Sequence, residues 1–392
     1  MKHETKLRLG LVGLGTAGRS VAEAAHKLPG WSFVAGADLR SEARNHYQTQ
    51  YGIRVFESVS QLCDWQGVDV VYVATPNFLH AEHAVTALES RKHVIVEKPM
   101  ALTLEQCDAM IAEAEKNGVR LMVAHTRSFN PPIRKMREVI ASNRLGRVVQ
   151  INTLRYSPWL VRPRLPEEVD TKLGGGVCYR QAPHQVDIVR LLGGGRVKSV
   201  RAAAGAWDPK NATEGNYTAM LEFEERAAAT LVYNGYGYFD DAELTTRHGE
   251  ARDLPGAGAR LRQAQEKGEL TKEASRSGLA FEIERGGDDA EDSSQQPFFG
   301  LTLVSCEKGD LRQSRNGLFC YEETGMTEIP CPKWEGPLTV ELRDFYEAVT
   351  EEKPVGHDGR WGKATLEVCL ALLQSSREKR ELPLFHQVPS PY

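Results

Sequence analysis

The chain has 392 residues with a formal net charge of −4 at pH 7, and 26% of its residues are charged. This length usually divides into two domains, and the balanced charge excludes the broad basic field of a nucleic-acid-binding protein. No apolar run approaches the roughly 18 residues that cross a membrane, and the first residues lack the apolar core of a signal peptide. We therefore expect a cytoplasmic protein that binds neither nucleic acid nor a membrane.

Seven cysteines are scattered along the chain, and no two of them form a CxxC pair. The odd number argues against a disulfide framework, and the spacing argues against a zinc site. We therefore expect reduced cysteines and no bound metal.

The chain opens with a strand predicted over 7–12, followed by the segment GLGTAG and a helix that Pro29-Gly30 ends. A second strand over 31–37 ends at an aspartate. This order is the pattern of a dinucleotide-binding unit, in which glycines let the backbone approach the pyrophosphate at a helix N-terminus. A tight turn without a ligand is the alternative. The residues predicted to bind the cofactor here are Gly13, Gly15, Thr16, Ala17 and Gly18.

The aspartate is Asp38, twenty residues after Gly18. Its carboxylate would accept hydrogen bonds from the adenosine ribose hydroxyls and repel a 2′-phosphate, which favours NAD over NADP. Arg40 softens that preference, so NADP stays the second cofactor to consider.

Strand–helix alternation continues as far as His125, with a helix that begins after the N-cap Thr103. Such alternation predicts a doubly wound parallel sheet, which binds ligands beyond the carboxyl ends of its strands. The further strands are predicted at 55–56, 68–76, 93–99 and 119–125.

Two short motifs fall at such strand ends. Thr75, Pro76 and Asn77 follow one strand, and Glu97 and Lys98 follow the next. We predict that all five residues line the cofactor site, with the Lys98 ammonium near the nicotinamide. A solvated loop lysine is the alternative.

A strand predicted over 146–157 leads into a loop that prolines break. The strand end and the loop carry Arg155, Arg162 and Arg164. Single arginines are mostly solvated, but several arginines close to a presumed catalytic helix favour an anionic substrate.

The segment GGGVCYRQAPHQVD, residues 174–187, is the second candidate site. Its glycines allow a positive φ or a close backbone approach, and Pro183 predicts a helix start that places His184 in the first turn. Arg180 precedes this start. The alternative is a glycine-rich turn that caps an ordinary helix.

The rest of the chain predicts antiparallel strands within 197–239 and 301–330 and two closing helices over 339–351 and 360–379. Residues 245–296 are polar and charged and are predicted to be an insert with a short helix. The fold class is α/β, with a Rossmann domain at 1–126 and a domain at 127–392 built on a large, mostly antiparallel sheet.

The motifs GLGTAG, ATPNFLH, EKP and GGG…PHQVD, in this order, resemble those of the Gfo/Idh/MocA oxidoreductase family. The resemblance implies an enzyme that moves hydride between a nicotinamide cofactor and an alcohol or carbonyl. It implies that Lys98 contacts substrate and cofactor, that His184 is the acid/base, and that the Lys98–Pro99 bond is cis. It also implies a homodimer or homotetramer formed through the second-domain sheet.

One departure from the family pattern bears on the substrate. Many sugar-oxidising members carry an aspartate four residues before the histidine, where this chain has Arg180, and Ala182 stands where a glycine is usual. A guanidinium suits a carboxylate rather than a sugar hydroxyl. We therefore expect a carboxylated substrate held by Arg180, with help from the loop arginines.

Within the family, three segments resemble those of the phthalate 4,5-cis-dihydrodiol dehydrogenases, which rearomatise a carboxylated dihydrodiol to a catechol. These segments are residues 162–170, 174–194 and 298–314. His184 would then be the base, with Asp187 orienting it, and Lys98 would stabilise the alkoxide. A sugar, inositol or ring-cleavage semialdehyde dehydrogenase is the alternative within the family. A non-catalytic NAD-binding regulator is the alternative from another class.

Overall fold

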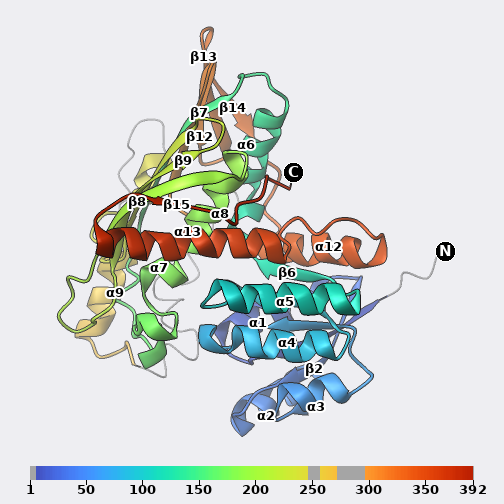
Figure 1. Cartoon of the computed structure of the whole chain (residues 1–392). Coiled ribbons are helices and arrows are strands. Elements are labelled where there is room, and N and C mark those ends of the chain that lie inside the picture. Colours follow the sequence, from blue (N-terminus) through green and yellow to red (C-terminus); the bar gives the residue numbers. More distant parts are fainter. Residues whose placement is uncertain (1–5, 246–256, 272–295, 392) are drawn as a thin grey trace. The chain divides into compact units, whose positions relative to one another are not determined.

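The computed structural model describes residues 6–245, 257–271 and 296–391. Two compact units make up the chain (Figure 1). The first unit runs to Thr126 and includes Glu335–Leu366, and the second unit comprises Arg127–Trp334 and the chain from Glu367 onward. The sequence-based division placed 335–366 in the second domain, whereas the structure groups it with the first.

The first unit is built on a six-stranded parallel sheet with the order β3-β2-β1-β4-β5-β6. All four residues of β4 are buried, as expected for a parallel strand covered on both faces. This confirms the predicted doubly wound sheet. The strands are β1 (Leu7–Val12), β2 (Trp31–Ala37), β3 (Arg54–Phe56), β4 (Val70–Val73), β5 (His93–Glu97) and β6 (Leu121–Ala124).

Helices cover this sheet in two groups. Helix α3 packs against α4 and α4 packs against α5, whereas α1 packs against α12 from the late part of the chain. The predicted capping box at the start of α5 is present, with Thr103 and Gln106 exchanging hydrogen bonds. The helices are α1 (Thr16–Lys27), α2 (Ser41–Tyr51), α3 (Val59–Asp64), α4 (His80–Glu89), α5 (Leu104–Asn117) and α12 (Pro337–Thr350).

The second unit is built on a nine-stranded sheet with the order β14-β13-β12-β11-β7-β10-β9-β8-β15. Its pairs are antiparallel except for β7 with β10, which confirms the mostly antiparallel sheet. The strands are β7 (Val148–Tyr156), β8 (Val197–Gly205), β9 (Asn216–Phe223), β10 (Ala228–Asn234), β11 (Leu301–Cys306), β12 (Gly309–Gln313), β13 (Gly317–Glu322), β14 (Gly325–Pro330) and β15 (Leu382–Pro383).

Helix α8 lies against β7 and β10 of this sheet, and every one of its residues is buried. Helix α8 spans Ala182–Leu192, and the other α-helices described in this unit are α6 (Pro131–Ala141), α7 (Gly176–Arg180) and α9 (Ala257–Glu266). The chain boundary between the units falls within α13 (Gly359–Glu378).

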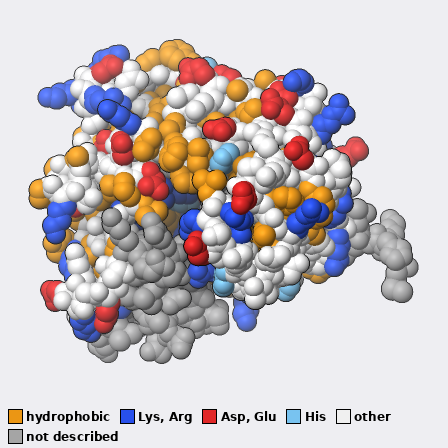
Figure 2. All heavy atoms as spheres, turned by 90° about the horizontal axis from the view of Figure 1, so that it is seen from below, with side chains coloured by type: hydrophobic (Ala, Val, Ile, Leu, Met, Phe, Trp, Pro, Cys, Tyr) orange, Lys and Arg blue, Asp and Glu red, His pale blue; other side chains and the backbone are white. Residues whose placement is uncertain are grey.

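Most of the predicted insert at 245–296 lies outside the described residues, and α9 matches the short helix predicted within it. Among the residues that the structure describes, every helix is too short or too polar to span a bilayer. Acidic and basic side chains are interspersed over the face shown in Figure 2.

Candidate functional site

The glycine-rich loop of the first unit uses its three glycines in three different ways. Gly13 has φ of +94°, and a Cβ there would lie 2.5 Å from the Ala74 carbonyl oxygen. At Gly15 a Cβ would meet no described atom within 4 Å, so this position faces open space. A Cβ at Gly18 would lie 2.2 Å from the Gly13 carbonyl oxygen. These are the tight turn, the phosphate approach and the close helix packing of a dinucleotide loop.

The start of α1 completes this cradle. Gly15 is its N-cap and no side chain caps it, while Thr16 and Ala17 are exposed in the first turn. Backbone N–H groups at a helix start favour an anion. The residues present therefore fit the pyrophosphate of NAD.

Asp38 lies at the end of β2 and faces the same loop. Its Oδ2 accepts a hydrogen bond of 2.9 Å from the Leu14 amide, and its two oxygens accept bonds of 2.9 Å from Arg40 Nε and Nη2. Burial works to raise the pKa of Asp38, but the bonds from Arg40 and Leu14 hold it below its ordinary value. An ionised carboxylate is thus fixed where the adenosine ribose is expected.

The two motifs at the strand ends are joined by a buried histidine. His80 is 1% exposed, and its Nε2 lies 2.8 Å from the Thr75 carbonyl oxygen while its Nδ1 lies 2.7 Å from that of Pro99. Each ring nitrogen lies within hydrogen-bond distance of one of these carbonyl oxygens. His80 therefore fixes the Thr75–Asn77 turn to the Glu97–Pro99 turn.

The Lys98–Pro99 peptide bond is cis, as the family resemblance implied. The preceding carboxylate, Glu97, accepts from the Lys98 amide at 3.2 Å and lies 3.1 Å from the Tyr72 hydroxyl. The same hydroxyl lies 3.4 Å from Glu341 of α12, which is fully buried. Burial, together with Glu97 and Glu341, raises the pKa of Tyr72 far above its ordinary value, so the hydroxyl keeps its proton for these carboxylates.

In the second unit, the glycines at the start of α7 allow close packing. Gly174 and Gly176 both have φ of +79°. A Cβ at Gly175 would lie 2.6 Å from the Glu168 carbonyl oxygen and from the Asp170 amide nitrogen. The glycine segment therefore lets the loop that carries Glu168 pack directly on the start of α7.

Helix α8 begins, as predicted, at the Pro183 segment, and places His184 in its first turn with 7% exposure. Gln185 fastens the helix to the sheet, since its Nε2 donates to Thr153 at 3.2 Å and to the Val232 carbonyl at 3.1 Å, and its Oε1 accepts from Tyr217. The motif thus contains one candidate catalytic side chain and one structural anchor.

Three of the predicted substrate arginines gather around Glu168. Arg180 lies 2.8 Å and Arg164 lies 3.4 Å from its Oε1. Burial would raise the pKa of Glu168, but the charges of Arg180, Arg164 and Arg162 help to hold it below its ordinary value. Arg180 belongs to α7, a helix that the sequence did not predict.

The fourth, Arg155 at the end of β7, belongs to the same neighbourhood. Burial raises the pKa of the Tyr233 hydroxyl, and the charges of Arg155, Arg162 and Arg164 act against that rise together with a bond to Ser157. The four arginines therefore share one region of the second unit.

Arg155 also forms a buried pair with an acid that the sequence did not single out. Its Nη1 lies 2.8 Å from Asp241, which is 1% exposed and also accepts from the Tyr156 amide at 2.7 Å. Burial raises the pKa of Asp241 even though Arg155 favours its charged form.

The aromatic ring of Phe299 lies beside His184, with ring centroids 4.9 Å apart and planes at 66°. The guanidinium carbons of Arg127 and Arg155 lie 5.2 Å and 5.6 Å from the same centroid. Phe299 stands in segment 298–314, which carries part of the family resemblance but gave this residue no role, and Arg127 stands in no motif. Only the fold of the second unit brings Phe299 beside His184 and Arg127 beside Phe299.

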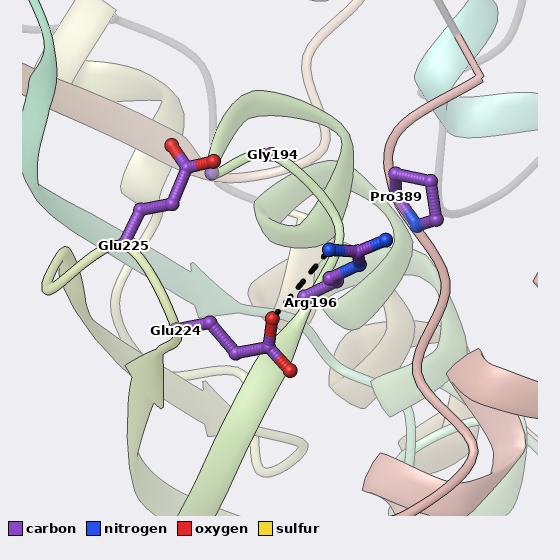
Figure 3. Close-up of a pocket in the computed structure, with 6 residues that line it drawn as sticks. Gly194, Arg196, Glu224, Glu225 and Pro389 are labelled. Carbon is purple, nitrogen blue, oxygen red and sulfur yellow. Dashed lines mark ion pairs between the residues drawn. The ribbon is translucent and has the colours of Figure 1, made fainter.

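A separate pocket of about 100 Å³ is lined by Gly193, Gly194, Arg196, Glu224, Glu225 and Pro389 (Figure 3). Arg196 and Glu224 form an ion pair of 3.7 Å across it. Pockets for small molecules usually measure about 300 Å³ or more, and none of the predicted site residues lines this one. No group of three or more His, Cys, Asp or Glu side chains among the described residues could hold a metal ion.

Comparison with known proteins bears on both units. Residues 7–125 match the family model of oxidoreductases with an NAD-binding Rossmann fold, and residues 133–251 match the Gfo/Idh/MocA C-terminal domain. The 1-carboxy-3-chloro-3,4-dihydroxycyclohexa-1,5-diene dehydrogenase of Comamonas testosteroni is 34% identical over 386 residues, which cover 95% of each chain.

Solved structures of other proteins have the same fold as this chain. A protein from Bordetella bronchiseptica RB50 is 38% identical with a TM-score of 0.86, covering 97% of this chain and all of the other. An oxidoreductase of Agrobacterium radiobacter, solved with NAD⁺, L-tartaric acid and magnesium, has a TM-score of 0.76 at 17% identity over 97% of this chain and 98% of the other. At that identity the likeness concerns the fold alone.

Proposed function

Because this chain belongs to the Gfo/Idh/MocA oxidoreductase family and is an NAD-dependent dehydrogenase, we propose that it oxidises a cis-diol of a carboxylated cyclohexadiene to the catechol. A phthalate cis-dihydrodiol is the first candidate within that class. The reaction removes a hydride from one carbinol carbon and a proton from its hydroxyl, and the resulting ring ketone enolises to the aromatic product.

The observation that carries the proposal is the group of arginines in the unit that holds His184. Arg164 and Arg180 lie 3.4 Å and 2.8 Å from Glu168, and Arg155 lies 2.8 Å from Asp241 of the same unit. A guanidinium has five N–H donors, so its pair with Glu168 or Asp241 is compatible with binding a substrate carboxylate. The internal pairs keep these long side chains in place before the substrate arrives.

Each catalytic step has a candidate residue. NAD, when bound by the glycine loop and Asp38, accepts the hydride. His184 takes the hydroxyl proton, and Lys98 stabilises the negative charge that develops on that oxygen. Arg180 with its neighbours holds the carboxylate and so orients the reacting carbon.

The relative from Comamonas testosteroni supports the substrate class. Its name describes a ring diene that carries one carboxylate and two adjacent hydroxyls. That chemistry agrees with what Arg180 indicated, because a carboxylated ring needs a cation and a diol needs a base.

Steady-state kinetics on a substrate panel test the proposal. The panel holds the cis-dihydrodiols of phthalate, benzoate and benzene, together with myo-inositol and glucose, with NADH followed by absorbance. We expect the carboxylated dihydrodiols to have the highest kcat/KM and Arg180→Ala to lower it by 10-fold or more. Faster turnover of inositol or glucose, unchanged by Arg180→Ala, would contradict the proposal.

A further inference from the structure

We infer that Tyr72 and Glu341 are positioning residues for Lys98. They act by holding the carboxylate of Glu97, the residue before Lys98, in one orientation. This role rests on the proposed function because Lys98 takes part in the hydride transfer, but it does not depend on the class of substrate. Neither the motifs nor the relatives assign a role to these two side chains.

The register of the parallel sheet brings the Tyr72 hydroxyl to Glu97. Tyr72 of β4 pairs with Ile95 of β5, and Glu97 stands two residues after Ile95, so both side chains point to the same face of the sheet. The Tyr72 hydroxyl lies 3.1 Å from Glu97 Oε1, and Tyr72 is fully buried. Burial and the adjacent carboxylates raise the pKa of Tyr72 far above its ordinary value, so the hydroxyl stays a proton donor.

Glu97 connects this contact to the main chain of Lys98. Its other oxygen, Oε2, accepts a hydrogen bond of 3.2 Å from the Lys98 amide. The next residue is Pro99, whose carbonyl oxygen lies 2.7 Å from His80 Nδ1. The backbone is therefore held on both sides of the Lys98 side chain. Such support matters because an error of about 1 Å in the placement of a reacting group can lower the rate by a factor of about 10².

Glu341 reaches the same hydroxyl from α12, a helix that follows the second sheet in the chain. Its Oε1 lies 3.4 Å from the Tyr72 hydroxyl, and Glu341 is 0% exposed. The next residue, Leu342, fixes the helix to the first unit, because its carbonyl oxygen accepts a hydrogen bond of 3.2 Å from the Trp31 indole. A carboxyl group from the late part of the chain is thus held against the strand that precedes the Thr75–Asn77 turn.

The burial of these polar groups is unfavourable for the stability of the fold. A hydroxyl or a carboxyl group in the interior lowers the free energy of unfolding, and apolar side chains of similar volume in its place are often neutral or stabilising. Buried ionisable groups that lie beside a candidate catalytic side chain are typical of functional sites. We therefore expect Tyr72 and Glu341 to contribute more to the reaction rate than to stability.

The test is a double-mutant cycle between this cluster and Lys98. The variant Tyr72→Phe/Glu341→Leu is compared with the wild type, and Lys98→Met is compared with the same change added to it. Tyr72→Phe/Glu341→Leu removes the hydroxyl and the buried acid together, so neither is left buried without the other. Tyr346→Phe is the matched control, because it removes a hydroxyl from the same helix and its ring lies 6.4 Å from that of Trp31. The substrate is the panel member that the wild type oxidises fastest.

We expect Tyr72→Phe/Glu341→Leu to lower kcat about 10-fold and to change KM for the substrate less than about twofold. Its melting temperature should stay within about 3 °C of that of the wild type. The same change added to Lys98→Met should lower kcat less than about twofold, because residues that act through one side chain are not additive with its removal. Tyr346→Phe should keep kcat within about twofold of the wild type.

Two results would overturn the inference. An equal loss of kcat with and without Lys98→Met would show that the cluster does not act through Lys98. Wild-type kcat in Tyr72→Phe/Glu341→Leu would show that the cluster has no part in the reaction.

Failure of the proposed function is a separate outcome. If the wild type oxidises inositol or glucose but no carboxylated dihydrodiol, the proposed function fails and the cycle is measured with the polyol. If the wild type oxidises no panel member, the cycle is measured on NADH affinity by fluorescence titration. Tyr72→Phe/Glu341→Leu should then weaken NADH binding about threefold, the effect of one hydrogen bond, and should have no effect when added to Lys98→Met. Any other result in that titration would overturn the inference.

Discussion

Lys98 and His184 are the two side chains on which the proposed chemistry depends most directly. His184→Asn should lower kcat by a factor of about 10² to 10⁴, the usual contribution of a general base. Lys98→Met should lower kcat by about 10² to 10³, because it removes a donor to the developing oxyanion. Stopped-flow and steady-state assays measure both changes.

Two further measurements make that prediction specific to catalysis. The His184→Asn variant should bind NADH as the wild type does and should lose the rise of kcat/KM with pH that a titrating base produces. His386→Asn serves as the control histidine. If His184→Asn kept the wild-type kcat, a group other than His184 would have to take the hydroxyl proton of the substrate.

Asp38 and Arg40 should set the choice between NAD and NADP. The low pKa of Asp38 keeps its carboxylate charged at neutral pH, where it binds Arg40 at both oxygens. In Asp38→Ala the Arg40 guanidinium loses this partner and can meet a 2′-phosphate. We expect NADH affinity to fall about 10-fold and NADPH affinity to rise, by fluorescence titration. The double variant Asp38→Ala/Arg40→Ala should lose the gain for NADPH.

The Asp38–Arg40 pair also contributes to stability in a pH-dependent way. A carboxyl whose folded-state pKa lies below its unfolded value of about 4 stabilises the fold above that value, and the contribution is lost as the pH falls through the folded pKa. Asp38→Asn should therefore lower the melting temperature at pH 7 and have little effect on it at pH 2 to 3. An equal change at both pH values would show that the pair is not its cause.

At the residue scale, the sequence identified the groups that stand in short motifs. The glycine loop, Asp38, Lys98 and His184 all have a fixed spacing to a strand or helix end. Phe299, Arg127 and Glu341 have none, because their partners lie far along the chain and meet them only in the folded sheet or helix layer.

At the element scale, the strands of both sheets follow from their apolar patterns, apart from the two-residue β15, whereas helices α6 and α7 do not. Helix α6 begins with Pro131 and Pro132, which suggest a break in the sequence but occupy the first turn of the helix. Helix α7 has five residues and starts at a glycine. A helix this short is decided by tertiary packing, here by the contact of Gly175 with the Glu168 loop.

The entry to β11 provides a stability prediction for this scale. Gly300→Ala combines a strained φ of +86° with a contact of 2.5 Å to a backbone oxygen. Gly118→Ala is the matched control, because Gly118 has φ of +65° and no described atom within 4 Å of its Cβ position. Left-handed backbone costs a residue with a Cβ about 1–2 kcal/mol, and overpacking adds about 1–3 kcal/mol.

Chemical denaturation of the two variants measures this difference. Gly300→Ala should be the less stable variant by the overpacking contribution, and it should also lower the rate of oxidation, since the neighbouring Phe299 contacts His184. Equal losses of stability in the two variants would mean that the strand end adjusts without cost.

For the whole chain, the first unit is completed by residues that follow the second sheet. The Trp31 indole donates to the Leu342 carbonyl at 3.2 Å, and Lys363 pairs with Asp108 at 2.6 Å. The alternation of strands and helices in residues 1–126 does not predict that residues 335–366 pack with them. Truncation before Glu335 should therefore unfold the first unit rather than leave a free Rossmann domain.

One face of the second sheet should hold identical subunits together. A row across five neighbouring strands, Leu303–Asn152–Thr230–Met220–Arg201, runs along this face, and Met220 is 55% exposed although it lies in the sheet. Apolar side chains that a sheet face leaves exposed, as here at Met220, are typical of a contact surface. We expect a homodimer or homotetramer in sedimentation velocity.

Met220→Glu should convert that assembly to monomers, because it replaces an exposed apolar side chain at the centre of the row with a charge that the contact would have to desolvate. Phe385→Glu is the control, since Phe385 is 78% exposed and lies outside this row. Circular dichroism should show both variants folded. If the wild type is a monomer, or if the oligomer persists in Met220→Glu at micromolar concentration, this face is not the contact between subunits.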